Sequence, residues 1–129
     1  KSTLPPRDRE ILILRIGWLC QSGYEWGQHV LIGLKSGLSE EDIEDIKTGP
    51  EAERWSSHDR LLLRAVDELN ADAFLSDDVW LGLKGSYSEP QMMDLVFTVG
   101  QYQLVSMALN TFGVQLDPGL PAMSQPPTQ

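Results

Sequence analysis

The sequence predicts a small, soluble, all-α domain, and three observations lead to this fold class. Helix start signals recur along the chain, apolar residues repeat at helical spacing, and no segment sustains the alternation of apolar and polar residues that marks a half-buried strand. A length of 129 residues fits one domain with its own core. Hydrophobic residues at 41% and charged residues at 22% indicate an ordinary globular protein.

The start signals are capping boxes, in which an N-cap serine and a polar side chain three residues later each bind the other's free backbone N–H. Matching segments begin at Ser22, Ser39, Ser56 and Ser88. Ser76, followed by two aspartates, is a simpler N-cap. Glycines that can close a helix in the left-handed conformation follow at Gly37, Gly49, Gly85 and Gly113. Together these signals predict about six helices, over residues 5–20, 23–36, 40–48, 57–72, 77–84 and 89–112.

Apolar spacing supports the same helices. The segment 5–20 has a wide apolar face, and 57–72 repeats leucine, alanine and valine at helical spacing. The segment 89–112 is nearly uncharged after Asp94, which predicts a helix buried on most sides, either centrally or against another subunit. Residues 117–129 contain four prolines among small polar residues, so we expect a domain over 1–116 and an extended Pro-rich tail without chemistry over 117–129.

Composition excludes several classes of function. A net charge of -9, with ten scattered Lys and Arg residues, argues against a nucleic-acid partner. No apolar run approaches the roughly 20 residues that cross a bilayer, so no membrane segment is expected. The single Cys20 excludes a two-cysteine redox cycle within the chain and suits the cytoplasm. Two histidines and no clustered cysteines argue against a dedicated zinc site, and we expect no metal.

The polar residues that could carry chemistry gather around the start of the second predicted helix. Glu25 and His29 are four residues apart and share a helix face, with Tyr24 on the neighbouring face. Ser22 lies at the helix start, where free amides tolerate negative charge. A carboxylate and an imidazole held together at the edge of a core can exchange a proton, as general acid–base catalysis requires.

Glu10 is a second carboxylate of interest, because it directly precedes the apolar run of residues 11–14. If its side chain points inward, desolvation raises its pKa and makes it a proton donor or acceptor near neutral pH. The alternative is a solvent-facing ion pair with Arg7 or Arg15.

These residues resemble a known family. The segment Leu4-Pro5-Pro6-Arg7-Asp8-Arg9-Glu10, the run that follows it through Arg15, and the element Tyr24-Glu25-Trp26 with His29 are similar to the carboxymuconolactone decarboxylase family, which includes the AhpD-like alkylhydroperoxidases. The resemblance covers roughly residues 4–113. It implies an AhpD-like helical bundle, assembly into homo-trimers or hexamers, and active sites near subunit contacts. Members usually carry further helices before the Leu-Pro-Pro-Arg segment, so an N-terminal portion is expected to be missing from this chain.

One departure from the family decides which branch the chain resembles. The peroxidase branch has a Cys-x-x-Cys pair, whose positions fall here on Ser22 and Glu25, and a further histidine, which falls on Tyr24. Cys20 lies two residues before the first redox position and does not replace it. The decarboxylase branch works without the pair and without a cofactor, and the proton-transfer residues that carry over are Glu10 and His29.

The resulting hypothesis is a cofactor-free lyase that acts on a small organic acid or lactone by proton transfer. Glu10 and His29 are its catalytic candidates, Tyr24 and Glu25 are further candidates from their position on the helix, and Ser22 and Trp26 are candidates for substrate binding. Two alternatives stay open: peroxidase chemistry through Cys20 alone, and a non-enzymatic oligomeric helical module.

Each candidate also has a purely structural explanation. Glu25 would be only the capping-box residue of Ser22, and His29 a hydrogen-bonded core residue. Tyr24 and Trp26 would wall a pocket or a subunit contact, and Cys20 would be a small buried hydrophobe. His58, in a predicted first helical turn, is expected on the solvated surface.

Overall fold

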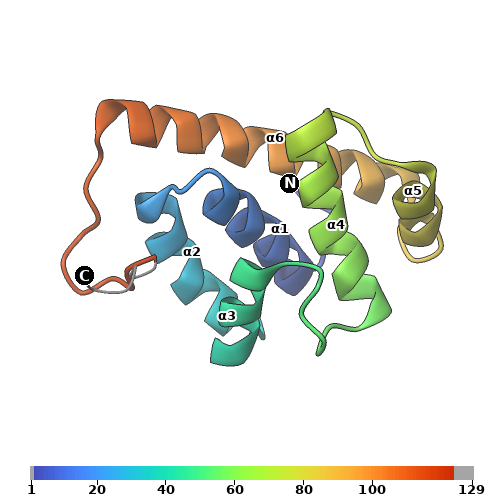
Figure 1. The fold of residues 1–129 in the computed structure, drawn as a ribbon, viewed down its shortest axis with the longest axis horizontal. Helices are drawn as coiled ribbons and strands as arrows, with labels where there is room; N and C mark the ends of the chain where they lie inside the picture. The colour runs from blue at the N-terminus through green and yellow to red at the C-terminus, as the bar shows by residue number, and fades with distance from the viewer. Residues whose placement is uncertain (1, 124–129) are drawn as a thin grey trace.

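A computed structural model describes residues 2–123 and confirms the all-α class, since no strand occurs in that part of the chain. Each helix boundary lies within one residue of its predicted position. The helices, in chain order (Figure 1), are α1 (Pro6–Leu19), α2 (Gly23–Lys35), α3 (Glu40–Thr48), α4 (Ser57–Asp72), α5 (Asp77–Lys84) and α6 (Glu89–Phe112). None of these helices has the length and apolar character needed to span a membrane.

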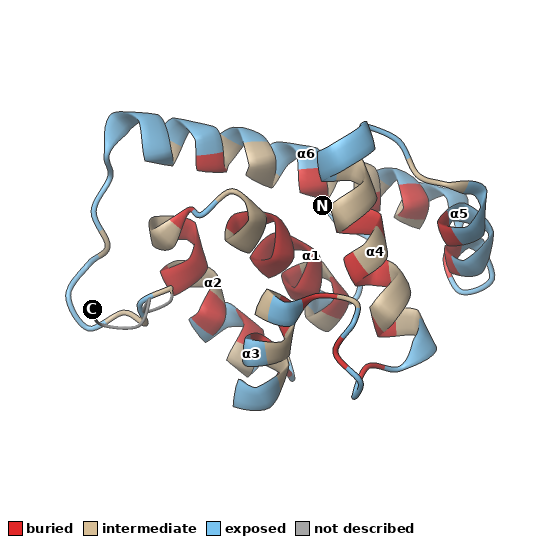
Figure 2. Cartoon of the chain, in the orientation of Figure 1, coloured by how far each residue is buried: buried red, intermediate tan, exposed pale blue. Residues whose placement is uncertain are grey.

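The central helix of the fold is α1, which packs against α2, α3, α4 and α6. Five consecutive or nearly consecutive apolar side chains of α1 are fully buried: Ile11, Leu12, Ile13, Leu14 and Ile16. Figure 2 shows α1 buried along most of its length, while the outer face of α6 is exposed. Within the single chain, burial on most sides therefore belongs to α1, and the prediction of central burial for α6 is wrong.

Most of the predicted helix starts are confirmed. Ser39 and Ser88 form complete capping boxes with Asp42 and Gln91, respectively. The hydroxyls of Ser56 and Ser76 each accept a backbone N–H of the first turn. The capping box predicted for Ser56 is incomplete, because the Asp59 carboxylate binds Arg7 and not the Ser56 backbone. Ser22 is the exception: it is the N-cap residue of α2, but its side chain makes no capping hydrogen bond. The capping box predicted for Ser22 and Glu25 is therefore wrong.

A helix ends within two residues of each of the four predicted glycines, and three of these glycines have the expected positive φ. Gly37, Gly49 and Gly113 have positive φ values, and Gly113 closes α6 in the left-handed conformation. Gly85 instead has a right-handed backbone with φ of -65°. The left-handed residue that ends α4 is Ala73, which a sequence pattern for glycine does not find.

Beyond Gly113 the chain reverses and runs back beside α2 (Figure 1). A side chain of Leu116 and the carbonyl oxygen of Pro121 lie against Gly27 of α2, and Met123 packs against the core. Part of the predicted tail, residues 124–129, lies outside the described residues.

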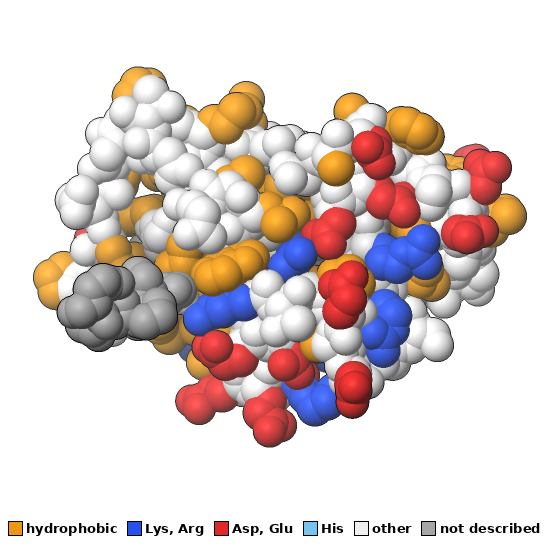
Figure 3. Space-filling view, in the orientation of Figure 1, with side chains coloured by type: hydrophobic (Ala, Val, Ile, Leu, Met, Phe, Trp, Pro, Cys, Tyr) orange, Lys and Arg blue, Asp and Glu red, His pale blue; other side chains and the backbone are white. Residues whose placement is uncertain are grey.

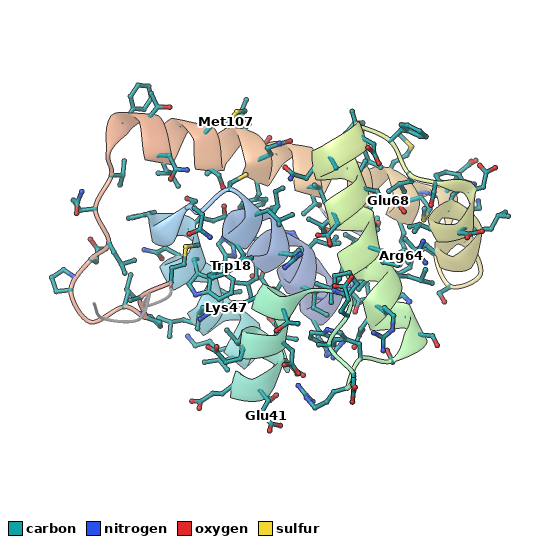
Figure 4. The ribbon with its side chains drawn as sticks, viewed as in Figure 1. Trp18, Glu41, Lys47, Arg64, Glu68 and Met107 are labelled. Atoms are coloured by element: carbon teal, nitrogen blue, oxygen red, sulfur yellow. The ribbon has the colours of Figure 1, made fainter. Side chains whose placement is uncertain are left out.

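The charge on the surface is mainly acidic around α3. Figure 3 shows a group of red side chains over this helix, and Figure 4 places Glu41 at its outer side. Arg54 joins Asp42 and Asp45 in ion pairs at this surface. The region is a solvated acidic face, as its sequence indicates.

Candidate active site

The centre of the candidate site is a hydrogen bond between Glu10 of α1 and His29 of α2. The distance from Nδ1 of His29 to Oε1 of Glu10 is 2.7 Å. Only 3% of the Glu10 side chain and 13% of the His29 side chain are exposed. Residues 11–14 are buried on every side of α1, and the Glu10 carboxylate that precedes them is also buried. A buried carboxylate needs a polar partner. The inward alternative for Glu10 is the one that the structure shows.

Two further side chains enclose this pair, and the sequence did not identify either of them. Arg9 places Nη1 at 3.4 Å from Oε2 of Glu10 and donates through Nη2 to the hydroxyl of Tyr102 at 3.3 Å. The Tyr102 ring lies edge-on to the His29 ring, with 5.2 Å between ring centres. Arg9 could have been suspected from its position next to Glu10. Tyr102 comes from α6, and nothing local in the sequence links it to α1 or α2.

The Glu25 carboxyl is buried on the same side of α2 as His29, with 3% of the residue exposed. Its Oε1 accepts a hydrogen bond of 2.6 Å from the Ser106 hydroxyl, and Oε2 has no partner among the described residues. Burial raises the pKa of Glu25 to about 7, against the opposing effects of the Ser106 hydrogen bond and the charge of His29. Glu25 is therefore a titrating buried acid and does not cap its helix.

The other predicted site residues of α2 do not join the Glu10–His29 pair. The Ser22 hydroxyl is fully buried and has no hydrogen-bond partner among the residues that the structure describes. Tyr24 lines a hollow of about 300 Å³ together with the end of α6 and the residues that follow it, and neither Glu10 nor His29 belongs to that lining. Both side chains lie toward the beginning of α2, one or more helical turns before His29.

Trp26 is also separate from the pair. It is 1% exposed and packs against Trp18, with 5.8 Å between ring centres. The Lys47 ammonium lies over both rings, 5.5 Å from the centre of Trp18 and 5.6 Å from that of Trp26. Figure 4 shows Trp18 and Lys47 side by side. These contacts give Trp26 a packing role in the core.

Cys20 is half-buried near the beginning of α2. Burial, and then the negative charge of Glu25, raise the pKa of its thiol above the ordinary value. Because the thiolate is the reactive form, this environment makes Cys20 less reactive at neutral pH than a free cysteine.

A surface hollow of about 240 Å³ lies beside the pair. Its lining includes both Arg9 and Tyr102, the two side chains that contact Glu10 and His29. Thr98 and Gln101 of α6 add polar groups to the same hollow. Arg9 and Tyr102 therefore connect this hollow to the acid–base pair.

A second polar cluster joins the beginning of α1 to the beginning of α4. Asp8 accepts hydrogen bonds from His58, at 2.9 Å, and from the Tyr87 hydroxyl. Asp8, His58 and Asp59 are close enough to hold a metal ion, but Arg7 donates to both oxygens of Asp59 at 3.0 and 2.9 Å. Arg7 thus already pairs with Asp59, and the cluster connects two helices. His58 is half-buried and paired, so its predicted place on the solvated surface is wrong.

Comparison with known proteins places these observations in a family context. The model of the family described as "CMD: Carboxymuconolactone decarboxylase family" matches residues 1–68, slightly more than half of the 129 residues. This segment includes Glu10, Glu25 and His29. A comparison with curated protein sequences gives no match.

Two solved structures share the fold. One is an Agrobacterium tumefaciens protein of unknown function, provisionally described as an antioxidant defence protein AhpD, with 21% identity, a TM-score of 0.82, and coverage of 89% of this chain and 80% of that protein. The other is an uncharacterized peroxidase-related protein from Silicibacter sp. TM1040, with 12% identity, a TM-score of 0.80, and coverage of 92% of this chain and 63% of that protein. At these identities the likenesses establish an AhpD-like fold and nothing about the reaction.

Proposed function

Because the chain belongs to the carboxymuconolactone decarboxylase family, we propose that it is a cofactor-free lyase that acts on a small organic acid or lactone by proton transfer through Glu10 and His29. The observation that carries this proposal is the 2.7 Å hydrogen bond between the two side chains in a nearly dry setting. A buried carboxylate that accepts a hydrogen bond from one N–H of an imidazole orients the ring and stabilises its charged form. The second nitrogen is then free to exchange a proton with a substrate.

In the proposed reaction, Glu10 holds the Nδ1–H of His29, and Nε2 of His29 is the proton carrier. When the bond between a substrate carbon and its carboxylate breaks, carbon dioxide leaves and the electron pair stays on the carbon, delocalised onto a neighbouring carbonyl as an enolate. The protonated His29 then gives its Nε2 proton to that carbon. In an enolisation, neutral His29 first takes the proton from the carbon and later returns it.

The developing negative charge needs a positive partner, and Arg9 is the side chain that supports this role. Its guanidinium lies beside Glu10 and borders the 240 Å³ hollow, and a third of the side chain is exposed. Ser22 and Tyr24 lie toward the beginning of α2, away from the pair, and their positions do not support a part in stabilising this charge. Preorganised charge beside the reacting group is an effective means of stabilising such a state.

The alternative of single-cysteine peroxidase chemistry is less well supported. Ser22 and Glu25 occupy the positions of the cysteine pair, and the pKa of Cys20 is raised where a reactive thiol needs a lowered one. The acid–base proposal uses groups that are in hydrogen-bond contact, whereas the thiol proposal requires an external reductant.

Replacement of the pair tests the proposal. We expect His29→Ala and Glu10→Gln each to lower turnover by roughly 10²–10⁴-fold, the usual contribution of general acid–base catalysis. The measurement is carbon dioxide release, or deuterium uptake from heavy water at the reacting carbon, over a panel of small lactones and oxo acids. His58→Ala is the matched control, because His58 is the second histidine and contacts Asp8 instead of the pair. Turnover near that of the wild type in both variants would end the proposal.

A further inference from the structure

Ser106 is an unusual residue in the second half of α6. Its neighbours Leu104 and Met107 are 57% and 54% exposed, but Ser106 is fully buried. Figure 4 shows Met107 on the outer side of α6, away from the rest of the molecule. A helical serine commonly bonds to the carbonyl one turn earlier. Ser106 instead donates its hydroxyl proton to Oε1 of Glu25, on another helix, at 2.6 Å.

Three helices together create the place that the Glu25 carboxyl occupies. The α2 helix supplies the carboxyl, α6 supplies the Ser106 donor, and α1 supplies the space. That space exists because residue 17 is a glycine: a Cβ atom there would lie 2.8 Å from Oε2 of Glu25. Oε2 is buried and has no partner in residues 2–123, so the bond to Ser106 is the hydrogen bond that holds this carboxyl.

The Glu25 carboxyl is electrically coupled to the acid–base pair. Glu25 and His29 are one helical turn apart on α2, and the charges of His29 and Glu10 both act on Glu25. The remaining titratable group close to it is the Cys20 thiol, on which Glu25 acts in turn. A change in the charge of Glu25 must therefore act back on His29 with the same energy, since such couplings are reciprocal.

We infer that Ser106 is a positioning residue of the proposed acid–base site: by holding the Glu25 carboxyl beside His29, it controls the charge that the Glu10–His29 pair experiences. The importance of this charge for catalysis rests on the proposed function, but the coupling itself does not. When Glu25 is protonated, the pair experiences no additional charge. When Glu25 ionises, the new negative charge favours the imidazolium form and makes His29 a stronger base.

Nuclear magnetic resonance can test this coupling without any substrate. His29 and His58 are the two histidines, so the imidazole signals are easily resolved and assigned. In the wild type we expect the carboxyl-carbon signal of Glu25 to show an inflection near pH 7, and the His29 ring signals to respond to the same ionisation. In Ser106→Ala we expect this inflection to move upward by about one pH unit, because the lost hydrogen bond stabilised the carboxylate. Glu25→Gln should remove the part of the His29 response that follows the Glu25 ionisation, which identifies its source.

The control is Ser22→Ala. It removes a second fully buried serine hydroxyl next to α2, but one that has no hydrogen-bond partner in the described part of the chain. We expect it to leave the inflection in place. Ser106→Cys, with thiols kept reduced, replaces the hydroxyl by a weaker donor and should move the inflection in the same direction as Ser106→Ala. An unmoved inflection in the folded Ser106 variants overturns the inference, whereas loss of the proposed function would show only in the turnover of the Glu10 and His29 variants.

Discussion

At the scale of single residues, the chemistry of this protein depends on which carboxyls are buried and what they contact. Glu10 and Glu25 are both almost inaccessible, but their environments differ. Glu10 has an imidazole and a guanidinium within reach, so its charge is compensated. Glu25 has one neutral hydroxyl, and burial therefore favours its protonated form. The two acids, on neighbouring helices, therefore lie in different electrostatic environments.

The raised pKa of Glu25 predicts how stability depends on pH. The folded protein holds this proton up to about pH 7, while the ordinary pKa is 4.5, so the unfolded chain releases the proton earlier. The contribution of Glu25 is therefore most favourable below pH 4.5 and is lost as the pH rises through 7, by up to about 3 kcal/mol. We expect Glu25→Gln to remove this loss. Urea unfolding at pH 5 and pH 8 measures it.

Glu41→Gln is the matched control for that measurement, because Glu41 is exposed on α3. It should preserve the pH dependence of the wild type. If the free energy of unfolding of Glu25→Gln changed between pH 5 and pH 8 as much as that of the wild type, the assignment of the titration to Glu25 would be wrong.

At the scale of helices, α2 has contacts on two sides. One side needs polar side chains, and the other needs a residue without a side chain. The side toward α1 presents His29 and Glu25 to the candidate site. The other side receives the segment after α6, which lies close because Gly27 has no side chain. A glycine inside a helix costs roughly 0.5–1 kcal/mol relative to alanine. At Gly27 this cost is offset by the contact with Leu116 and Pro121.

Gly27→Ala should therefore displace the segment that follows α6. The added Cβ would lie 2.4 Å from a methyl carbon of Leu116 and 2.9 Å from the Pro121 carbonyl oxygen. A side-chain methyl can move, but the backbone carbonyl requires the segment itself to shift. We expect faster hydrogen exchange and faster proteolytic cleavage over residues 114–123. Gly23→Ala is the control, since nothing lies within 4 Å of its Cβ position. Equal cleavage rates in the two variants would contradict the seating of the segment on Gly27.

At the scale of the whole molecule, the single chain leaves many apolar side chains uncovered along the outer face of α6. They are Met93, Phe97, Leu104, Met107 and Phe112, each more than half exposed. Figures 2 and 3 show this exposed face and the hydrophobic side chains on it. An extended apolar helix face of this kind is typical of a subunit contact. Assembly into a trimer or hexamer, which the family resemblance implies, remains a prediction.

We expect light scattering to give a multiple of the chain mass of 14.4 kDa. The double substitution Leu104→Glu and Met107→Glu should reduce the mass to that of one chain, because buried unpaired charges are costly at an interface. Leu81→Glu is the control: Leu81 is 68% exposed but lies on α5 and not on α6. A monomeric wild type at micromolar concentration would show the prediction to be wrong.

The sequence by itself determined the helices, because the signals that begin and end a helix act within a few residues. Ser39 and Ser88 are capped by side chains three positions away, and the boundaries followed from such pairs. The helical period also predicted that Glu25 and His29 share one side of α2. Local signals gave a wrong prediction where a distant residue is the actual partner. Glu25 does not cap α2, because its carboxyl accepts a hydrogen bond from the hydroxyl of Ser106, 81 residues away.

Only the tertiary structure decided which polar groups meet. The side chains that complete the candidate site, Tyr102 and Ser106, come from α6, and their contacts with α1 and α2 depend on how three helices pack. Burial of Glu10, which makes its contact with His29 chemically significant, follows from α1 being the central helix and not α6. Capping hydrogen bonds depend on residues a few positions apart, whereas the desolvation of a carboxyl group depends on how all the helices pack. For this reason the helices could be predicted from the sequence, whereas the environments of Glu10 and Glu25 required the tertiary structure.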